Sequence, residues 1–387
     1  MYFIWEVYYM KEENRRYAEE AFEIVEHAAK KIGSRLPGSD GEKEYAAYMG
    51  DKLRSIGIEP VREEFAVSPR ASIGGIPYAG YLGLIMSALV YVALHLSAVW
   101  YGMALASVVC WVWLILSVFL YKTWFDMFFK QEISQNTYGE LLPPDGKYDY
   151  TIILSGHTDT SWCWRHSAHA SKFKKTKPAM GLVATFAKVG FGVICFLFLT
   201  AVSIAMTVIS SGVYFGEVWA LKIANSASFA NFLFAMHFLP VVTAIGCMFV
   251  VMWADPNPRN ASRGAMDNAT GCALSFAVTK YFHDHPEKMP KNCRIIDFNC
   301  GSEEAGLRGS IAFTREHKGE PILENTWNIN IDSVADKDFF EVVIKDDWQF
   351  CRFDTDLEKM FKDTFNELGI VSKTNGCIHN PVGGCDS

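Results

Sequence analysis

Two long apolar blocks interrupt a chain that is otherwise rich in polar positions. Residues 71–121 contain no Asp, Glu, Lys or Arg, and the second block, 189–254, contains only Glu217 and Lys222. A helix that crosses a membrane needs about 20 apolar residues, so each block is long enough for two. We expect transmembrane helices, paired as two hairpins, near 78–99, 101–121, 188–210 and 230–253. A buried hairpin of a soluble protein is the alternative, but uncharged runs of this length argue against it.

The remaining segments show the periodicities of shorter helices and strands. Apolar residues recur at helical spacing over 11–32 and 42–56, and the second helix has Ser39 or Asp40 as its N-cap and Gly57 at its end. Strands are predicted at 58–67, 135–141, 150–154, 294–298, 327–331 and 341–345, and further helices at 272–283, 306–317 and 354–369. Strands that alternate with helices and end in polar residues indicate an α/β fold, with a doubly wound mixed sheet and helices on both faces.

Composition and charge narrow the classes of function. The 387 residues are 50% hydrophobic and 20% charged, and a net charge of −7 without a basic stripe argues against nucleic acid as a partner. The ten cysteines form no C-x-x-C pair, and Cys110, Cys195 and Cys247 lie inside apolar runs, which fits a reducing compartment. The N-terminus reaches Glu6 almost at once and lacks the features of a signal peptide.

Basic residues are distributed unequally around the predicted spans. Because each hairpin returns the chain to the side it left, all the polar segments lie on one face of the membrane. The turns on the other face hold only Lys222, whereas the side of the polar segments carries Arg62, Arg70, Lys122, Lys130, Lys172, Lys174, Lys175, Lys177, Lys188, Arg259 and Arg263. Since positive residues favour the cytoplasmic side, we expect an integral membrane protein whose soluble domain is cytoplasmic.

Four polar clusters lie at strand ends or helix starts, where open α/β sheets bind ligands. They are His157-Thr158-Asp159, Asp267-Asn268, Glu303-Glu304 and Asp332-Ser333. Two adjacent carboxylates at the end of a buried strand repel each other, and a divalent cation would offset that cost, although a solvated pair at a helix start is the alternative. One imidazole and several carboxylates together predict a two-metal hydrolytic site, in which Asp159 would hold the imidazole of His157 from behind.

The motifs occur in a recognisable order along the chain. They are Ser155-Gly156-His157-Thr158-Asp159, GAMDNATG at 264–271, SEEAGLRGS at 302–310 and Asn330-Ile331-Asp332-Ser333, with RLPGS at 35–39 before a helix. In this order they resemble the co-catalytic di-zinc exopeptidases of the aminopeptidase type, relatives of glutamate carboxypeptidase, transferrin receptor and glutaminyl cyclase. The resemblance covers nearly all of the polar segments and none of the four spans. It implies a peptidase domain formed by 11–70, 131–177 and 259–387, with the hairpins 76–121 and 188–253 inserted.

The resemblance also implies a role for each cluster. His157 would bind one of two Zn²⁺ ions, Asp267 would bridge both, and Asp332 would complete the shell of the first. Glu304 would bind the second ion. Glu303 would be the general base that takes a proton from the attacking water and passes it to the leaving amine. The implied function is a membrane-anchored zinc aminopeptidase that releases N-terminal residues from small peptides.

One part of the resemblance is missing at the C-terminal end. The family supplies a last histidine to the second zinc after a Gly-Gly-x-Asp-Ser turn, and this chain stops at Ser387, within that turn. We expect the missing ligand to lie beyond Ser387 in a longer sequence. His379 is the alternative, although it precedes the turn.

Two other classes of function compete with a peptidase. A catalytically inactive membrane scaffold or receptor on the same fold would usually have lost metal ligands, and the four motifs here keep them. A transporter would place charged residues inside its spans, and the interiors of the predicted spans hold none. The sequence does not separate an aminopeptidase from a dipeptidase or a carboxypeptidase.

Overall fold

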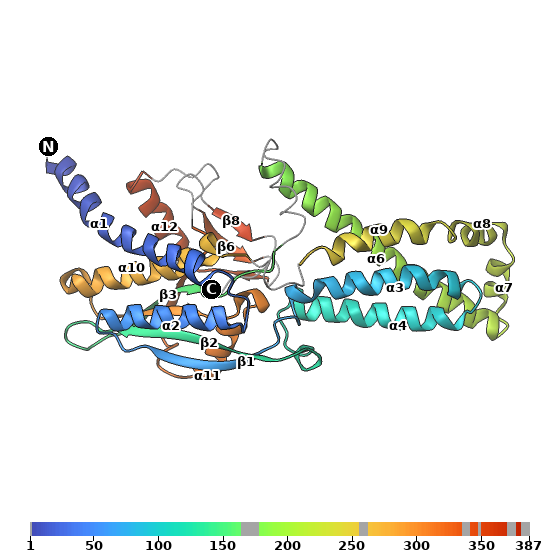
Figure 1. Ribbon diagram of the computed structural model, residues 1–387, viewed down its shortest axis with the longest axis horizontal. Helices are drawn as coiled ribbons and strands as arrows, with labels where there is room; N and C mark the ends of the chain where they lie inside the picture. Colours follow the sequence, from blue (N-terminus) through green and yellow to red (C-terminus); the bar gives the residue numbers. More distant parts are fainter. Residues whose placement is uncertain are drawn as a thin grey trace. The chain divides into compact units, whose positions relative to one another are not determined.

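The computed structural model of the chain (Figure 1) describes residues 2–163, 178–254, 262–334, 341–346, 350–369 and 377–380. The chain divides into two compact units. The first unit comprises Met1–Ala71, Phe119–Ser161 and Asn257–Ser387, and the second comprises Ser72–Val118 and Trp162–Pro256. The second unit therefore consists of two segments that are inserted into the sequence of the first.

A five-stranded mixed sheet forms the centre of the first unit. Its strands are β1 (Val61–Val67), β2 (Glu132–Leu141), β3 (Tyr150–His157), β4 (Cys293–Cys300) and β5 (Thr326–Asn330), in the order β1-β2-β4-β3-β5. The first three strands in that order pair antiparallel, whereas β3 pairs parallel with both β4 and β5. The carboxyl ends of β4, β3 and β5 consequently meet at one edge. The predicted α/β fold with a mixed sheet is confirmed.

Helices cover both faces of this sheet because side chains of β4 alternate between the faces. On one face α1 (Tyr2–His27), the π turn η1 (Ala28–Ile32), α2 (Asp40–Ser55) and α10 (Thr270–Asp284) share a core that includes Ile24, Tyr45, Met49 and Phe276. On the other face Phe313 of α11 (Arg308–Glu316) packs with Ile296 and Phe298 of β4. The sheet therefore has a hydrophobic layer on each face, covered by helices as the sequence predicts.

Local signals in the sequence set the ends of several elements. Ser39 is the N-cap of α2, and its hydroxyl accepts a hydrogen bond from the Glu42 amide at 3.3 Å. Gly57 follows the end of α2 with a φ of +78°, in the left-handed region that glycine adopts without strain. The helix predicted over 42–56 thus begins slightly earlier, at Asp40.

The strand predicted at 341–345 lies outside the main sheet. It is β6 (Val342–Asp346), which pairs antiparallel with β7 (Cys351–Arg352) and parallel with β8 (Cys377–Asn380) in a separate three-stranded sheet. α12 (Thr355–Glu367) follows β7 and is capped by Asp354, whose carboxylate accepts the amides of Asp356 and Leu357. Periodicity alone identified this strand but not the sheet that it joins.

The second unit is helical in the residues that the structure describes. It contains α3 (Ile76–Ala93), α4 (Ala98–Trp113) with its π-helical continuation η3 (Leu114–Phe119), α6 (Pro178–Tyr214), α7 (Val218–Ala224), α8 (Ala227–Ala235) and α9 (Leu239–Val251). Three stretches are long and apolar enough to cross a membrane, namely Ile73–Ala93, Ala98–Phe119 and Ala187–Tyr214. The pair α8 and α9 makes a fourth if it counts as one span.

The fourth predicted span differs from the continuous helix expected over 230–253. α8 and α9 meet at an angle of 48°, and Pro240 lies in the first turn of α9. Proline has no amide hydrogen and its ring excludes the preceding turn of a helix, so it is tolerated at a helix start but not inside one. Pro240 therefore interrupts the helix within the hydrophobic run, and a hydropathy pattern does not show this interruption.

Small residues let the helices of this unit approach closely. Gly80 of α3 faces α9 so closely that a Cβ at this position would lie 2.5 Å from the backbone nitrogen of Val251. The same two helices share a hydrogen bond of 2.9 Å between the hydroxyls of Ser87 and Thr243, both of which are buried. Close backbones and buried hydroxyl pairs are the features that hold helices together in a lipid environment.

One buried carboxyl group lies within the main sheet, away from the strand ends. Asp297 is in the middle of β4 and is completely buried. Its Oδ1 accepts a hydrogen bond of 2.8 Å from the Asn299 side chain, while Oδ2 has no partner among the described residues. Burial raises the pKa of Asp297 to about 8, and the hydrogen bond from Asn299 only partly opposes this rise.

This raised pKa predicts a specific pH dependence of stability. The pKa of an unfolded Asp is about 3.9. The folded protein therefore binds one more proton than the unfolded chain between about pH 4 and pH 8. Asp297 therefore favours the folded state below this window, and that stabilisation is lost as the pH rises through it. We expect Asp297→Asn to raise the melting temperature at pH 8 and to change it little at pH 4.

The measurement is thermal unfolding of the full chain in detergent at both pH values. Because 1 kcal/mol corresponds to about 2–4 °C in a protein of moderate size, a gain of this order is readily detected. Asp145→Asn is the matched control, since Asp145 is exposed in a turn. A variant that keeps the full pH dependence of the wild type would contradict the assignment.

Candidate metal centre

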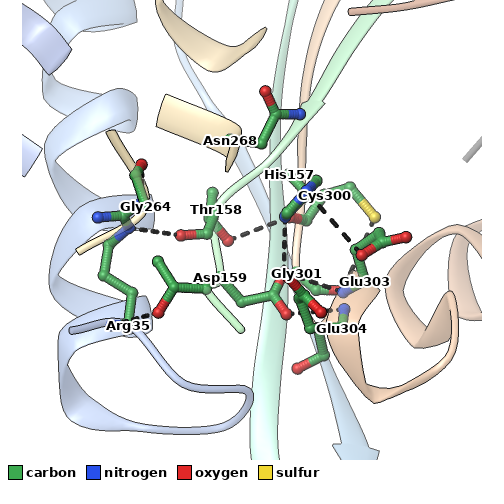
Figure 2. Close-up of polar contacts among 12 residues, drawn as sticks. Arg35, His157, Thr158, Asp159, Gly264, Asn268, Cys300, Gly301, Glu303 and Glu304 are labelled. Atoms are coloured by element: carbon green, nitrogen blue, oxygen red, sulfur yellow. Dashed lines mark hydrogen bonds and ion pairs between the residues drawn. The ribbon is translucent and has the colours of Figure 1, made fainter. Parts of the chain in front are cut away.

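His157 lies at the edge where the parallel strands end. It is the last residue of β3, opposite Cys300 of β4, and its side chain is 1% exposed. The amide and hydroxyl of Thr158 both donate to the carbonyl of Cys300, at 2.7 and 3.0 Å, which fixes the chain just beyond the strand (Figure 2). The imidazole is thus held by the sheet itself.

Three carboxylates surround one nitrogen of this imidazole. His157 Nε2 lies 3.0 Å from Asp267 Oδ1, 3.8 Å from Asp332 Oδ2 and 3.9 Å from Glu303 Oε2. It is buried and yet makes no hydrogen bond of ordinary geometry with any described residue. Ligand atoms of His157, Asp267 and Asp332 all lie within 4.8 Å of one another, as the ligands of a single metal ion would.

The electrostatics of the cluster also fit a cation. Burial and the nearby charge of Asp267 hold the pKa of Glu304 well above its usual value, and burial likewise raises the pKa of Asp332. Burial opposes ionisation of Asp267 too, but the close contact with His157 Nε2 and the charge of that imidazole outweigh it and lower the pKa of Asp267. Carboxylates crowded around one imidazole repel each other, and imidazole nitrogen with carboxylate oxygen is a donor set that suits Zn²⁺.

Asp159 connects the histidine to the turn that carries the two glutamates. Its Oδ1 lies 3.2 Å from His157 Nδ1, the contact that the sequence predicts for a residue holding the imidazole from behind. The same carboxylate accepts the amides of Glu303 and Glu304, each at 2.9 Å (Figure 2). Asp159 is fully buried, so it sets the position of both the imidazole and the following turn. The second of these contacts was not predicted.

The paired glutamates lie in the short helical turn η8 (Glu303–Ala305). Ser302 before the turn and Gly306 after it both have left-handed backbone conformations, with φ of 55° and 96°. The Glu303 side chain is 16% exposed and faces His157, whereas Glu304 is buried. Glu304 interacts electrostatically with Asp267 but lies outside the group of three close ligand atoms.

Asn268 brings the remaining two acidic residues together. Asp267 and Asn268 lie at a kink within η6 (Ala265–Ala269), where both have non-helical backbone angles, and the peptide bond between them is cis. The Asn268 amide group donates to the carbonyl of Ile331 at 2.9 Å and accepts the amide of Gly271 at 2.9 Å. Since Ile331 precedes Asp332, this side chain joins the loops of both aspartates. The sequence placed Asn268 in a motif without assigning it this contact.

Arg35 is a second positioning residue that the sequence did not single out. It is completely buried, and its guanidinium donates to the carbonyls of Thr158 at 2.7 Å, Arg263 at 2.8 Å and Gly264 at 2.8 Å (Figure 2). These carbonyls flank His157 on one side and Asp267 on the other. A single cation from the N-terminal segment therefore connects the loop that carries His157 with the loop that carries Asp267.

Glu42 is a further positioning residue, and it holds the turn that carries the two glutamates. This buried residue of α2 accepts the amide and hydroxyl of Ser302, at 2.7 and 2.9 Å, and the amide of Gly38 at 2.6 Å. The spacing Ser39-x-x-Glu42 is that of a capping box, which predicts a local role at the helix start. Instead the carboxylate reaches the residue before Glu303. Burial and the charge of Asp159 raise the pKa of Glu42 to about 8.

Some predicted features lie outside the described residues. Asp386 and Ser387 belong to the range 381–387, which the structure does not describe. His379 lies in β8 opposite Lys345 of β6, and its side chain is not among those described. His157, Asp267, Glu303, Glu304 and Asp332 are all described and gather at one edge of the sheet.

Comparison with known proteins gives one family match. Residues 248–375 match the model described as Peptidase family M28. This stretch includes Asp267, Glu303, Glu304 and Asp332 and begins after His157. For this part of the chain, the match confirms the resemblance to zinc exopeptidases that the motifs indicate. No curated protein matches the sequence significantly.

Solved structures show a more distant similarity. A zinc aminopeptidase from Bacillus subtilis is 12% identical, with a TM-score of 0.46, over 96% of this chain and 80% of that chain. A leucine aminopeptidase precursor from Bacteroides thetaiotaomicron is 11% identical, with a TM-score of 0.44, over 94% and 76%. A glutaminyl cyclase from Fimbriiglobus ruber is 11% identical, with a TM-score of 0.37, over 84% and 64%. Values this low carry no conclusion about activity.

The contacts of Glu42 generate a prediction about the turn beside it. Glu42→Gln keeps the shape of the side chain but replaces an acceptor with a donor, which leaves one or two buried donors of Gly38, Ser134 or Ser302 unsatisfied. Each such loss costs about 1–3 kcal/mol. We expect the amides of Ser302, Glu303 and Glu304 to exchange with deuterium faster than in the wild type.

The measurement is hydrogen exchange of the full chain, read on peptides that contain residues 302–304. Glu44→Gln is the control, because Glu44 is exposed on the same helix and its removal should leave this exchange unchanged. Equal exchange in Glu42→Gln and the wild type would show that Glu42 does not hold the turn.

Proposed function

We propose that this chain is a membrane-anchored, zinc-dependent metallopeptidase that acts as an aminopeptidase on small peptides. The observation that supports it most directly is the environment of His157 Nε2, a buried nitrogen without a well-formed hydrogen bond that faces three carboxylates. The match of residues 248–375 to a peptidase family is independent support. Neither a scaffold nor a transporter explains why these acidic groups gather around one imidazole.

The residues present can be divided between two ions. His157 and Asp332 would hold one Zn²⁺, Asp267 would bridge, and Glu304 would hold the second. Bound zinc supplies a water of lowered pKa and polarises the carbonyl of the substrate. Asp159 holds the imidazole in position through Nδ1, as the second partner of a metal-binding histidine usually does.

Glu303 is the group that we assign to proton transfer. Its carboxylate lies near the ligands, at 3.9 Å from His157 Nε2, and it keeps some exposure to solvent, unlike Glu304. A base must reach the attacking water and then the leaving amine, so it cannot be fully enclosed by ligands. Glu303 would take the proton from the attacking water and pass it to the leaving amine, which becomes the new N-terminus of the shortened peptide.

Replacing this base separates catalysis from metal binding. We expect Glu303→Gln to lower kcat by about 10²–10⁴-fold, the usual contribution of a general base, while zinc content stays at the wild-type level. Asp267→Asn should lose both zinc and activity. The measurements are zinc content by elemental mass spectrometry and release of the N-terminal residue from chromogenic amino-acid amides.

Glu316→Gln is the matched control, because Glu316 is exposed on α11 and should retain full activity. The experiment requires a full-length chain in detergent or nanodiscs. A wild-type protein without zinc, or a Glu303→Gln variant with unchanged kcat, would overturn the proposal.

The orientation in the membrane can be tested with one exposed thiol. Cys351 is a free, exposed cysteine of the first unit. If that unit is cytoplasmic, a membrane-impermeant maleimide should label Cys351 in sealed inside-out vesicles and not in right-side-out vesicles, with Cys351→Ser as the control for other thiols. A Lys222→Cys variant in a Cys351→Ser background should give the opposite result. Labelling of Cys351 in right-side-out vesicles would reverse the assignment.

A further inference from the structure

The chain re-enters the first unit through residues 120–130, which we call the re-entry segment. It contains the short 3₁₀ helix η4 (Asp126–Phe128) and carries three large apolar side chains that are mostly exposed. Trp124 is 68% exposed, Met127 76% and Phe128 72%. Three exposed apolar residues within five positions form an unusually apolar surface for a segment of the first unit.

The exposed side chains are close together in the sequence. Trp124 lies two residues before the 3₁₀ helix η4, and Met127 is inside it. Phe128 follows directly, and its ring lies 6.0 Å from that of Phe125. Exposed lysines, Lys122 and Lys130, flank the group on both sides. Apolar and aromatic residues bordered by lysine are typical of the surface region of a membrane.

Chain continuity indicates what covers this surface. The apolar stretch Ala98–Phe119 is long enough to span a membrane, and the re-entry segment begins at the next residue. If that stretch crosses the bilayer, Trp124 and Met127 lie only a few residues from its end. Lysines at this position meet the anionic lipids of the cytoplasmic leaflet. The occupant that fits is therefore the lipid surface itself.

A buried ion pair connects the re-entry segment to the rest of the first unit. Arg308 is 4% exposed, and its Nη2 lies 2.9 Å from Asp126 Oδ1. The same guanidinium donates from Nη1 to the carbonyl of Tyr121 at 3.0 Å and to that of Gly306 at 3.3 Å. The backbone of Asp126 is held as well, because its carbonyl accepts the Ser68 hydroxyl at 2.9 Å. Arg308 thus holds the segment at two points, the carbonyl of Tyr121 and the side chain of Asp126.

Arg308 also closes the turn that carries the paired glutamates. Its amide donates to the carbonyl of Ser302 at 3.1 Å, and the amides of Gly306 and Leu307 both donate to the carbonyl of Glu303 at 2.8 Å. A shift of Asp126 would therefore move the arginine at the end of the Glu303–Glu304 turn. Removing Asp126 would leave the buried charge of Arg308 without this partner, which is costly.

We propose that the re-entry segment binds the lipid surface through Trp124, Met127 and Phe128, and that the Asp126–Arg308 pair uses this contact to hold the Glu303–Glu304 turn in place. The effect on catalysis rests on the function proposed above, whereas the lipid contact and its effect on the turn do not. Arg308 and Asp126 are positioning residues in this scheme, since neither lies among the carboxylates around His157.

The lipid contact is tested by fluorescence quenching in full-length protein. Wild type and Trp124→Phe are reconstituted in vesicles of phosphatidylcholine and phosphatidylglycerol, with bromine near the headgroup end of the acyl chains. The difference in tryptophan emission isolates Trp124, and we expect bromine to reduce this difference about twofold or more relative to unbrominated vesicles. Trp327→Phe is the control, since Trp327 is 41% exposed in the first unit and should report no quenching. An unquenched Trp124 overturns the proposal.

The connection to the turn is tested by hydrogen exchange, which does not depend on activity. In the same vesicles, the variant Trp124→Ser/Met127→Ser/Phe128→Ser should exchange the amides of Glu303 and Glu304 about tenfold faster than the wild type. Asp126→Ala should do the same and Asp126→Glu should restore slow exchange. Met360→Ser, at another exposed methionine, is the control. Unchanged exchange in the triple variant overturns the proposal, even if Trp124 is quenched.

Turnover and zinc content then separate this inference from the proposed function. We expect the triple variant to lose about tenfold in kcat, with KM and zinc content unchanged, as expected when a catalytic group is slightly misplaced. A wild-type chain that shows quenching and lipid-dependent exchange but no zinc or turnover would refute the peptidase and leave the lipid contact established. An active enzyme whose kcat is equal in the triple variant would refute the connection to catalysis.

Discussion

The site depends on negative charge that converges on one buried imidazole. Asp267, Asp332 and Glu303 approach His157 Nε2, while Asp159 occupies the other ring nitrogen. Like charges at this density are stable only when a cation or protons compensate them. Much of the surrounding structure serves to hold these groups together against their repulsion. The same repulsion is the physical reason for proposing a metal ion at this cluster.

Two buried residues from the N-terminal segment, Arg35 and Glu42, hold many of these groups in position. Arg35 connects the loops that carry His157 and Asp267, and Glu42 holds the residue before Glu303. Neither touches the centre of the cluster. Their burial is tolerated because almost every polar atom of theirs is matched by a backbone or hydroxyl partner. Residues 35–42, which lead into α2, are therefore as important to the geometry as the motifs that carry the acidic side chains and His157.

The apolar insertions place a second constraint on the first unit, namely the positions at which the chain leaves and re-enters it. One of these points is bound to Arg308, directly after the paired glutamates. An insertion of this kind need not alter the sheet, since its ends lie in loops. It does make the loops beside the site respond to whatever surrounds the inserted helices. In the second unit, α3 and α9 approach closely at Gly80 and share the buried hydroxyl pair Ser87–Thr243, which are features that suit helices in lipid.

Most of the helices and strands, and the acidic residues and histidine of the candidate site, could be predicted from the sequence because their signals are local. Periodicity fixed the helices and strands, uncharged runs marked the apolar helices, and acidic or histidine residues at strand ends marked the site, because each signal lies within a few residues. The separate sheet of β6 and the long-range contacts of Arg35, Glu42, Asn268 and Arg308 were decided only by the tertiary structure. These contacts join residues from 63 to 260 positions apart, and the sheet depends on which strands β6 meets. A single sequence does not encode that proximity in any local pattern.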